Sequence, residues 1–290
     1  MHIARHVKLL GPFAVAAPDD AMAKGLHLVT TYFRQGASPE HTKEVVKGIV
    51  KNLDNDAIAM VHVLYDGETP PDLVKWQETA PHKQKLLLVK THSMPPTYSE
   101  LLAYANTRLK RGAVAILASA DMYFDSALAC IKPVSPESSR FQITFRQAKR
   151  PFFALTRRHA PECGAKPDYK NVFDLCDNYI GSHDAFVFAV PVADEIVREV
   201  NHTQYSGLGA ENVLVWELNH SGEWRGFNPC DLVGAYHLHC SVDRSYSVLG
   251  KDSRLIFVSR KGFNGARQRR HGIVKPWHLR KTIACPFEMY

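Results

Sequence analysis

The stretch Gly112–Asp125 constrains the fold of this chain more than any other part of the sequence. Its first half, Ala113–Ala118, is a short and uninterrupted apolar run, which predicts a strand covered on both faces in the middle of a parallel sheet. Two acids follow this run, Asp121 and Asp125. In an open α/β sheet, ligands bind beyond the carboxyl ends of the strands, where a carboxylate is well placed to hold a divalent cation. The alternative is a strand that ends in an Asp-capped turn.

Strands and helices alternate along the first half of the chain. Short apolar segments predict strands, and capped segments with apolar residues at helical spacing predict helices. The expected strands are 25–31, 57–65, 85–90 and 113–118, and the expected helices begin at residues 38, 71 and 96. This alternation predicts an α/β fold with a mostly parallel sheet flanked by helices. The second half is less regular, with strands expected at 141–145 and 185–190 and helices at 193–200 and 211–218.

The composition is that of a soluble globular protein, with 45% hydrophobic and 22% charged residues. No apolar run reaches the roughly 20 residues that a membrane span requires. The six cysteines form no Cys-x-x-Cys pair, which favours free thiols in a reducing compartment but leaves disulfides open. We therefore expect a cytoplasmic or nuclear protein rather than a secreted one. The sequons at Asn201 and Asn219 would matter only in a secreted chain.

The net charge of +7 is concentrated at the C-terminus, because residues 251–290 hold ten Lys or Arg and two acids. Phe263 and Trp277 lie between these charges, and such an arrangement suits a nucleic acid. The alternative is a tail that folds on the surface and sends one or two cations to a bound diphosphate. The residues expected to contact nucleic acid or phosphate are Arg260, Lys261, Arg267, Arg269, Arg270 and Lys275.

Further acids and histidines stand at the ends of the expected strands and helices. Asp66 follows a strand, Asp184 precedes one, and Glu211 begins a helix. His237 and His239 alternate along an expected strand, so their imidazoles would point to the same face, as two metal ligands could. Taken singly, each has a structural explanation, as a turn residue, a partner of the helix dipole or a hydrogen-bonded core histidine.

Five sequence blocks, taken in their order along the chain, are similar to those of a known family. They are Leu28–Arg34, Pro96–Tyr98 with Tyr104–Asn106, Ser119–Asp125, Gly181–Phe188 and Tyr236–Ser241. Together they resemble glycosyltransferases of the GT-A (nucleotide-diphospho-sugar transferase) fold, over roughly residues 25 to 246. The resemblance implies a GT-A-like, Rossmann-like domain at 25–250 with a less regular acceptor-side half. It would follow an N-terminal extension, 1–24, and precede a basic C-terminal extension, 251–290, packed on or near the domain.

The resemblance implies a hexosyltransferase-type enzyme that moves a sugar from a nucleotide-diphosphate sugar, UDP-linked rather than GDP-linked, to a hydroxyl acceptor. Asp121 would bind a Mn²⁺ or Mg²⁺ ion together with His237 or His239, and Asp125 is a further candidate ligand. Asp184 or Glu211 would face the acceptor, and one of them would act as general base in an inverting enzyme. The implied donor-binding residues are Thr30, Thr31, Tyr32, Arg34, Asp66, Thr97, Tyr98, Asn106 and Ser119.

Two positions depart from the family pattern. Ser119 stands where Asn or Asp is common, and a hydroxyl is a poorer metal ligand than a carboxylate, so Asp125 could substitute. His183 stands where glutamine is expected. The basic C-terminus makes a nucleic-acid base a candidate acceptor. Two alternatives stay open: a catalytically degenerate GT-A-fold protein that binds nucleic acid or a protein partner, and a nucleotidyltransferase.

Overall fold

The computed structural model of the chain describes residues 25–32, 38–91, 95–131, 150–164, 183–203 and 210–241. The expected N-terminal extension, the strand expected at 141–145 and the basic segment 251–290 lie outside these ranges. None of the described helices is both long enough and apolar enough to cross a membrane.

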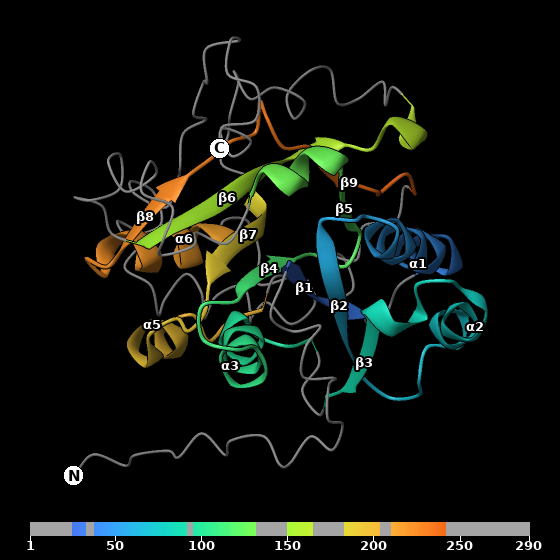
Figure 1. Ribbon diagram of the computed structural model, residues 1–290, viewed down its shortest axis with the longest axis horizontal. Coiled ribbons are helices and arrows are strands. Elements are labelled where there is room, and N and C mark those ends of the chain that lie inside the picture. Colours follow the sequence, from blue (N-terminus) through green and yellow to red (C-terminus); the bar gives the residue numbers. More distant parts are fainter. Residues whose placement is uncertain are drawn as a thin grey trace.

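The described strands form one curled, nine-stranded sheet with the order β3-β2-β1-β4-β7-β6-β9-β5, and β8 pairs with β6. Four parallel strands occupy one end (Figure 1): β1 (Leu26–Tyr32), β2 (Ile58–Tyr65), β3 (Leu86–Lys90) and β4 (Val114–Ala118). The strand β7 (His183–Ala189) then pairs antiparallel with β4. The remaining strands are β5 (Met122–Phe124), β6 (Arg150–His159), β8 (Trp224–Phe227) and β9 (Ala235–His237).

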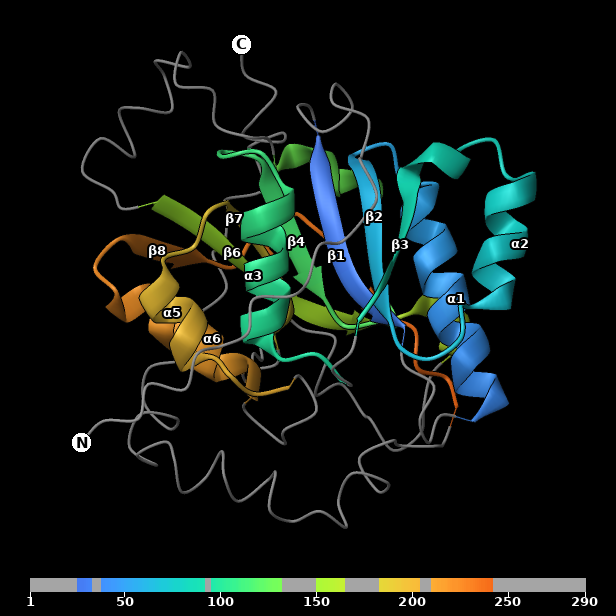
Figure 2. The same ribbon diagram turned by 90° about the horizontal axis from the view of Figure 1, so that it is seen from below.

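Helices cover both faces of the sheet (Figures 1 and 2). On one face lie α1 (Pro39–Leu53) and α2 (Pro71–Thr79), and on the other lie α3 (Tyr98–Arg108), α5 (Asp194–Glu199) and α6 (Ala210–His220). Single 3₁₀ turns occur at Lys83–Lys85, Ser126–Cys130 and Pro161–Cys163. The expected α/β class, with a mostly parallel sheet flanked by helices, is confirmed.

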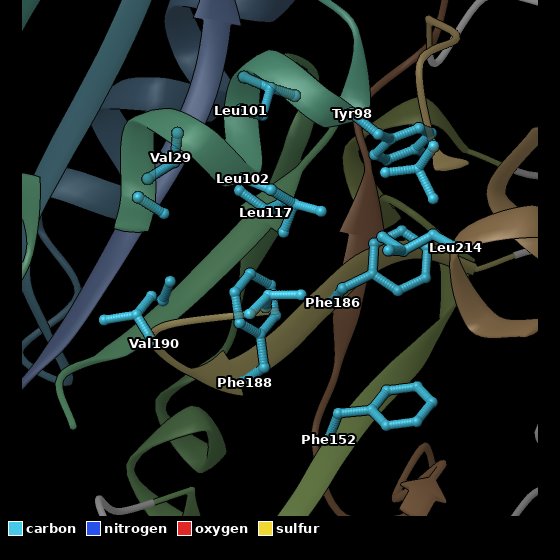
Figure 3. Close-up of a cluster of buried hydrophobic side chains, with 14 of the residues drawn as sticks. Val29, Tyr98, Leu101, Leu102, Leu117, Phe152, Phe186, Phe188, Val190 and Leu214 are labelled. Carbon is cyan, nitrogen blue, oxygen red and sulfur yellow. The ribbon is translucent and has the colours of Figure 1, made fainter. Parts of the chain in front are cut away.

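Two apolar clusters, one on each face of the sheet, pack these helices against it. Both faces are apolar because successive side chains of a strand point alternately to the two faces. Figure 3 shows the cluster under α3 and α6, where Phe186 and Phe188 of β7 lie beside Phe152 of β6. Tyr98 at the start of α3 packs edge to face on Phe186, with ring centroids 5.9 Å apart. Burying a phenylalanine side chain stabilises the fold by about 1.5–3 kcal/mol, so this cluster fixes β7 against the parallel strands.

Polar side chains of α1 hold the short strand β5 in place. The buried Asn52 donates to the Met122 carbonyl at 2.8 Å and accepts from the Phe124 amide at 3.2 Å. One turn earlier, Gly48 brings the helix close to the chain, since a Cβ there would lie 3.5 Å from the carbonyl carbon of Asp121. The position of Asp121 therefore depends on the packing of α1.

The pKa values of two buried histidines, His62 and His183, predict how the free energy of unfolding depends on pH. Burial, with a smaller contribution from His27, lowers the pKa of His62 to about 3, and burial lowers the pKa of His183 to about 3 as well. Both folded-state values lie below the unfolded value of about 6.5, so the unfolded chain binds more protons as the pH falls from 6.5 towards 3. We expect each histidine to lower the free energy of unfolding by about 1.4 kcal/mol per pH unit in this window.

Urea unfolding at a series of pH values below neutrality measures this slope. Replacing His62 with Gln should reduce it, because the titration of one buried histidine is removed. The exposed His82 provides the matched control, and His82→Gln should leave the slope unchanged. A slope that is the same in the His62 variant and in the wild type would contradict the assignment.

The expectation of free thiols is wrong for the described residues. Cys163 and Cys240 form a disulfide with a Cα–Cα distance of 4.7 Å. Cys130 and Cys230 are disulfide-bonded as well, and no described cysteine is free. The absence of a Cys-x-x-Cys pair in the sequence argues only against a zinc site. It does not distinguish free thiols from disulfides between distant cysteines. Disulfides are typical of oxidising compartments, so the reason for expecting a reducing one is removed.

Candidate functional site

Parallel strands bring several of the singled-out residues to one edge of the sheet. Because β1, β2 and β4 run in the same direction, Tyr32, Tyr65 and Ala118 all lie at carboxyl ends. The register places Thr30 next to Ala118, and the Thr30 hydroxyl donates to the Ala118 carbonyl at 3.0 Å. Thr31 is buried at the same edge, and its hydroxyl oxygen has no hydrogen-bond partner. Asp66 follows β2 directly.

Asp121 occupies the connection between β4 and β5. A tight turn forms there, with the Met122 amide donating to the Ser119 carbonyl at 3.1 Å. The Ser119 amide donates to the Asp184 carbonyl of β7, and the Leu238 amide donates to the Asp121 carbonyl at 2.8 Å. These bonds fix the backbone of the turn from two sides, and the Asp121 side chain is only 10% exposed.

Three imidazoles surround the Asp121 carboxylate. Its Oδ2 atom lies 2.9 Å from His237 Nε2 and 3.5 Å from His239 Nδ1. The third imidazole is His41, in the first turn of α1, whose ring centroid lies 4.7 Å from that of His239. His41, Asp121 and His239 each offer one ligand atom, and these atoms lie within 4.8 Å of one another. The structure thus brings together residues from the beginning, the middle and the end of the described chain.

The charge of Asp121 follows from these neighbours. Burial alone would raise the pKa of its carboxyl, but the charge and hydrogen bond of His237, the hydrogen bond of His239 and the charge of His41 outweigh it. The pKa is therefore held well below its usual range, and the carboxylate is ionised at neutral pH.

The donor set fits a divalent cation. One ionised carboxylate and neutral imidazoles suit first-row transition metals, and the imidazoles favour Mn²⁺ over Mg²⁺, which prefers oxygen ligands. Ligands about 2–2.2 Å from an ion lie up to about 4.4 Å apart, so a small adjustment of His41, Asp121 and His239 would bring all three onto one ion. His237 contacts the same carboxylate oxygen as His239 and would orient the carboxylate.

His41 did not stand out in the sequence. It lies inside a segment whose pattern indicates only the start of a helix, and the cap supports that, with the His41 amide donating to Ser38 Oγ at 3.2 Å. His239 also differs from its expected setting, because β9 ends at His237. The imidazoles of His237 and His239 nevertheless both face Asp121, because the Leu238–Asp121 hydrogen bond holds the chain after β9.

Asp125 has a different partner from Asp121. Its Oδ2 atom accepts the Gly234 amide at 3.1 Å, and burial raises the pKa of its carboxyl. A Cβ on Gly234 would collide with this carboxylate, so the glycine is needed for the contact. Asp125 therefore connects β5 to the loop before β9, and it does not belong to the group of ligand atoms around Asp121.

Among the acceptor-side candidates, Asp184 is closer to the site than Glu211. Asp184 pairs with Arg157 of β6, with Nη1 and Oδ2 2.8 Å apart, and its carbonyl binds the Ser119 amide next to Asp121. Glu211 lies in the first turn of α6, which packs against β7 and β8.

Several expected donor-binding residues have structural contacts instead. Thr97 caps α3 in a capping box with Glu100, and Tyr98 is buried in the core. Asn106 donates to the Val192 carbonyl at 2.7 Å and accepts from the Val192 amide at 2.9 Å. These bonds use both the nitrogen and the oxygen of the Asn106 side-chain amide. They lie near the amino end of β4, opposite the edge that carries Asp121, so the position of Asn106 differs from the expectation. Arg34 and the six basic residues between Arg260 and Lys275 lie outside the described residues.

Comparisons with known proteins find similarity among solved structures but not in sequence. No protein-family model matches the chain, and no curated protein matches it in sequence. A mannosyltransferase from Pyrobaculum calidifontis, solved with GDP-Man and Mn²⁺, is similar at 14% identity over 87% of this chain and 68% of its own, with a TM-score of 0.49.

Two further solved structures are similar. S. aureus TarS with UDP-GlcNAc matches at 10% identity over 77% of this chain, with a TM-score of 0.46, and this chain spans 60% of it. Glucosyl-3-phosphoglycerate synthase from Mycobacterium tuberculosis, with Mn²⁺, UDP-Glc and phosphoglyceric acid, matches at 14% identity over 83% of this chain and 81% of its own, with a TM-score of 0.38.

Proposed function

We propose that the chain is a metal-dependent glycosyltransferase that moves a sugar from a nucleotide-diphosphate sugar to a hydroxyl acceptor. The observation that carries this proposal is the convergence of Asp121, His239 and His41 beyond the carboxyl ends of β1, β2 and β4. Ligands of open α/β sheets bind at this edge. The buried carboxylate is ionised before any ligand arrives, so this ligand can bind a cation without first losing a proton.

When bound, a Mn²⁺ or Mg²⁺ ion would neutralise the negative charge that develops on the departing nucleoside diphosphate. Asp121, His239 and His41 would hold it, and His237 would keep the Asp121 carboxylate oriented. Thr31, Tyr32 and Asp66 lie where β1 and β2 end and would contact the nucleotide. The unpartnered Thr31 hydroxyl supports this role, because a buried polar atom costs free energy until it forms a hydrogen bond.

Asp184 is the candidate for the acceptor side. Arg157 orients its carboxylate, and its backbone joins the turn that carries Asp121. In an inverting enzyme this carboxylate would accept the proton of the attacking hydroxyl. Glu211 lies in the first turn of α6, whereas the Asp184 carbonyl binds the turn that carries Asp121, so we assign the role to Asp184.

A thermal-shift screen of nucleotide sugars, with and without Mn²⁺, tests the proposal. A donor that binds only the native state raises the melting temperature, and we expect a shift that needs both donor and metal. Release of nucleoside diphosphate with transfer to a hydroxyl acceptor would identify the reaction. Release of pyrophosphate would instead indicate a nucleotidyltransferase, and metal-dependent binding without turnover would indicate a degenerate protein. A nucleic-acid acceptor has no support among the described residues.

Replacing Asp184 with Asn should lower the transfer rate by roughly 10²–10⁴-fold while donor affinity stays the same, because general-base catalysis contributes about that factor. Steady-state transfer rates and donor binding by calorimetry check the two quantities. Asp194→Asn, at an exposed position of α5, is the matched control and should change neither. An equal loss of donor affinity and rate would contradict the acceptor-side role.

A further inference from the structure

The side chain of Glu44 connects the two segments that carry the histidines of the candidate metal site. It lies on α1, one turn after His41, and is 13% exposed. Its Oε2 atom lies 3.2 Å from His41 Nδ1 and accepts the Ser241 hydroxyl at 3.0 Å. Its Oε1 atom accepts the amides of Cys240 and Ser241 at 2.9 Å and 2.7 Å. A single carboxylate therefore makes all of these contacts.

These contacts act on both histidines of the site. On the α1 side, a carboxylate facing Nδ1 favours the tautomer in which Nδ1 carries the proton, so the lone pair of His41 is on Nε2 and is free for a cation. On the other side, the two backbone amides directly follow His239. Glu44 thereby fixes the distance between segments that lie 196 residues apart in the sequence.

The disulfide adds a second and different tether to the same segment. Cys163, at the end of a 3₁₀ turn after β6, holds the side chain of Cys240, whereas Glu44 holds the backbone of Cys240 and Ser241. The covalent bond limits how far His239 can move but leaves the backbone free to rotate. The hydrogen bonds to Glu44 restrict that rotation and, together with the Leu238–Asp121 hydrogen bond, set the direction of the imidazole.

We propose that Glu44 is a positioning residue that pre-forms the metal site by fixing the His41 tautomer and the backbone after His239. This inference rests on the proposed metal-dependent function. Glu44 does not belong to the group of ligand atoms His41, Asp121 and His239, so its role is exerted through the two histidines.

Two substitutions separate the parts of this role. In Glu44→Gln, the remaining oxygen can still accept both backbone amides, but an NH₂ group then faces His41 Nδ1 and favours the wrong tautomer. In Glu44→Ala, both the tautomer and the backbone contacts are lost. Glu40→Gln removes the same charge from an exposed position in the first turn of the same helix, so it is the matched control for the helix dipole.

Mn²⁺ binding, followed by the electron paramagnetic resonance signal of the free ion, measures the effect. We expect an affinity loss of roughly 10-fold for Glu44→Gln and up to roughly 100-fold for Glu44→Ala, and no change for Glu40→Gln. Hydrogen exchange of the metal-free protein is the second measurement. The Cys240 and Ser241 amides should exchange faster in Glu44→Ala and as in the wild type in Glu44→Gln.

The outcomes distinguish this inference from the proposed function. If the wild type binds Mn²⁺ and Glu44→Ala binds it equally well, the positioning role is overturned and the transferase proposal stands. If the wild type does not bind Mn²⁺, both are overturned. Equal losses in Glu44→Ala and Glu40→Gln would assign the effect to long-range charge and overturn the positioning role.

Discussion

Replacing Asp121 with Ala is expected to abolish Mn²⁺ binding and to lower the transfer rate by about 10³-fold or more. The variant keeps three imidazoles but loses the only carboxylate in the group of ligand atoms His41, Asp121 and His239. Metal-ion catalysis contributes several kcal/mol to the stabilisation of charge in the transition state, and each factor of ten in rate corresponds to about 1.4 kcal/mol. Titration with Mn²⁺ and single-turnover transfer rates measure the two losses.

The fold should survive this substitution, because the hydrogen bonds of the turn involve backbone atoms that alanine retains. Far-ultraviolet circular dichroism checks this. Asp125→Asn is the matched control, since it changes the neighbouring carboxylate while an Asn oxygen can still accept the Gly234 amide. The control should bind Mn²⁺ normally. If Asp121→Ala retains turnover, or if Asp125→Asn loses Mn²⁺ binding, the assignment of the metal ligand is wrong.

The parallel half of the fold could be predicted because its signals are local. A buried strand needs only a short apolar run, and α1 needs only a cap and apolar residues at helical spacing, as at Ser38 and Ile49. The structure has β1–β4 and α1–α3 within about two residues of the expected bounds. Asp121 was identified for the same reason, because it lies three residues after the apolar strand that ends at Ala118.

The residues that the sequence did not identify depend on contacts between distant segments. The strand β5 has three residues, and it exists because Met122–Phe124 pairs with β9 and is held by Asn52. His41 becomes a candidate ligand only when α1 packs beside β5. Pairing of cysteines likewise depends on the fold, as the 77 residues between Cys163 and Cys240 show. Local periodicity carries no information on any of these contacts.

Removing the Cys163–Cys240 disulfide, with both cysteines replaced by Ser, is expected to lower the free energy of unfolding by about 4 kcal/mol. The bond closes a loop with a sequence separation of 77, and cross-linking a loop of this length restricts the unfolded chain by about that amount. Guanidinium unfolding of the oxidised proteins measures the loss. Replacing both cysteines with Ala separates the missing bond from the added hydroxyls, and the two double variants should agree.

The same variant should bind Mn²⁺ more weakly, because His239 precedes Cys240 and loses one of the contacts that hold its segment. The hydrogen bonds from Cys240 and Ser241 to Glu44 remain, so we expect a smaller affinity loss than the roughly 100-fold of Glu44→Ala. Reducing agent added to the wild type should shift its affinity in the same direction. A stability loss below about 1 kcal/mol would contradict the expected effect of the cross-link, and the position of His239 would then be assigned to Glu44 and the Leu238–Asp121 hydrogen bond.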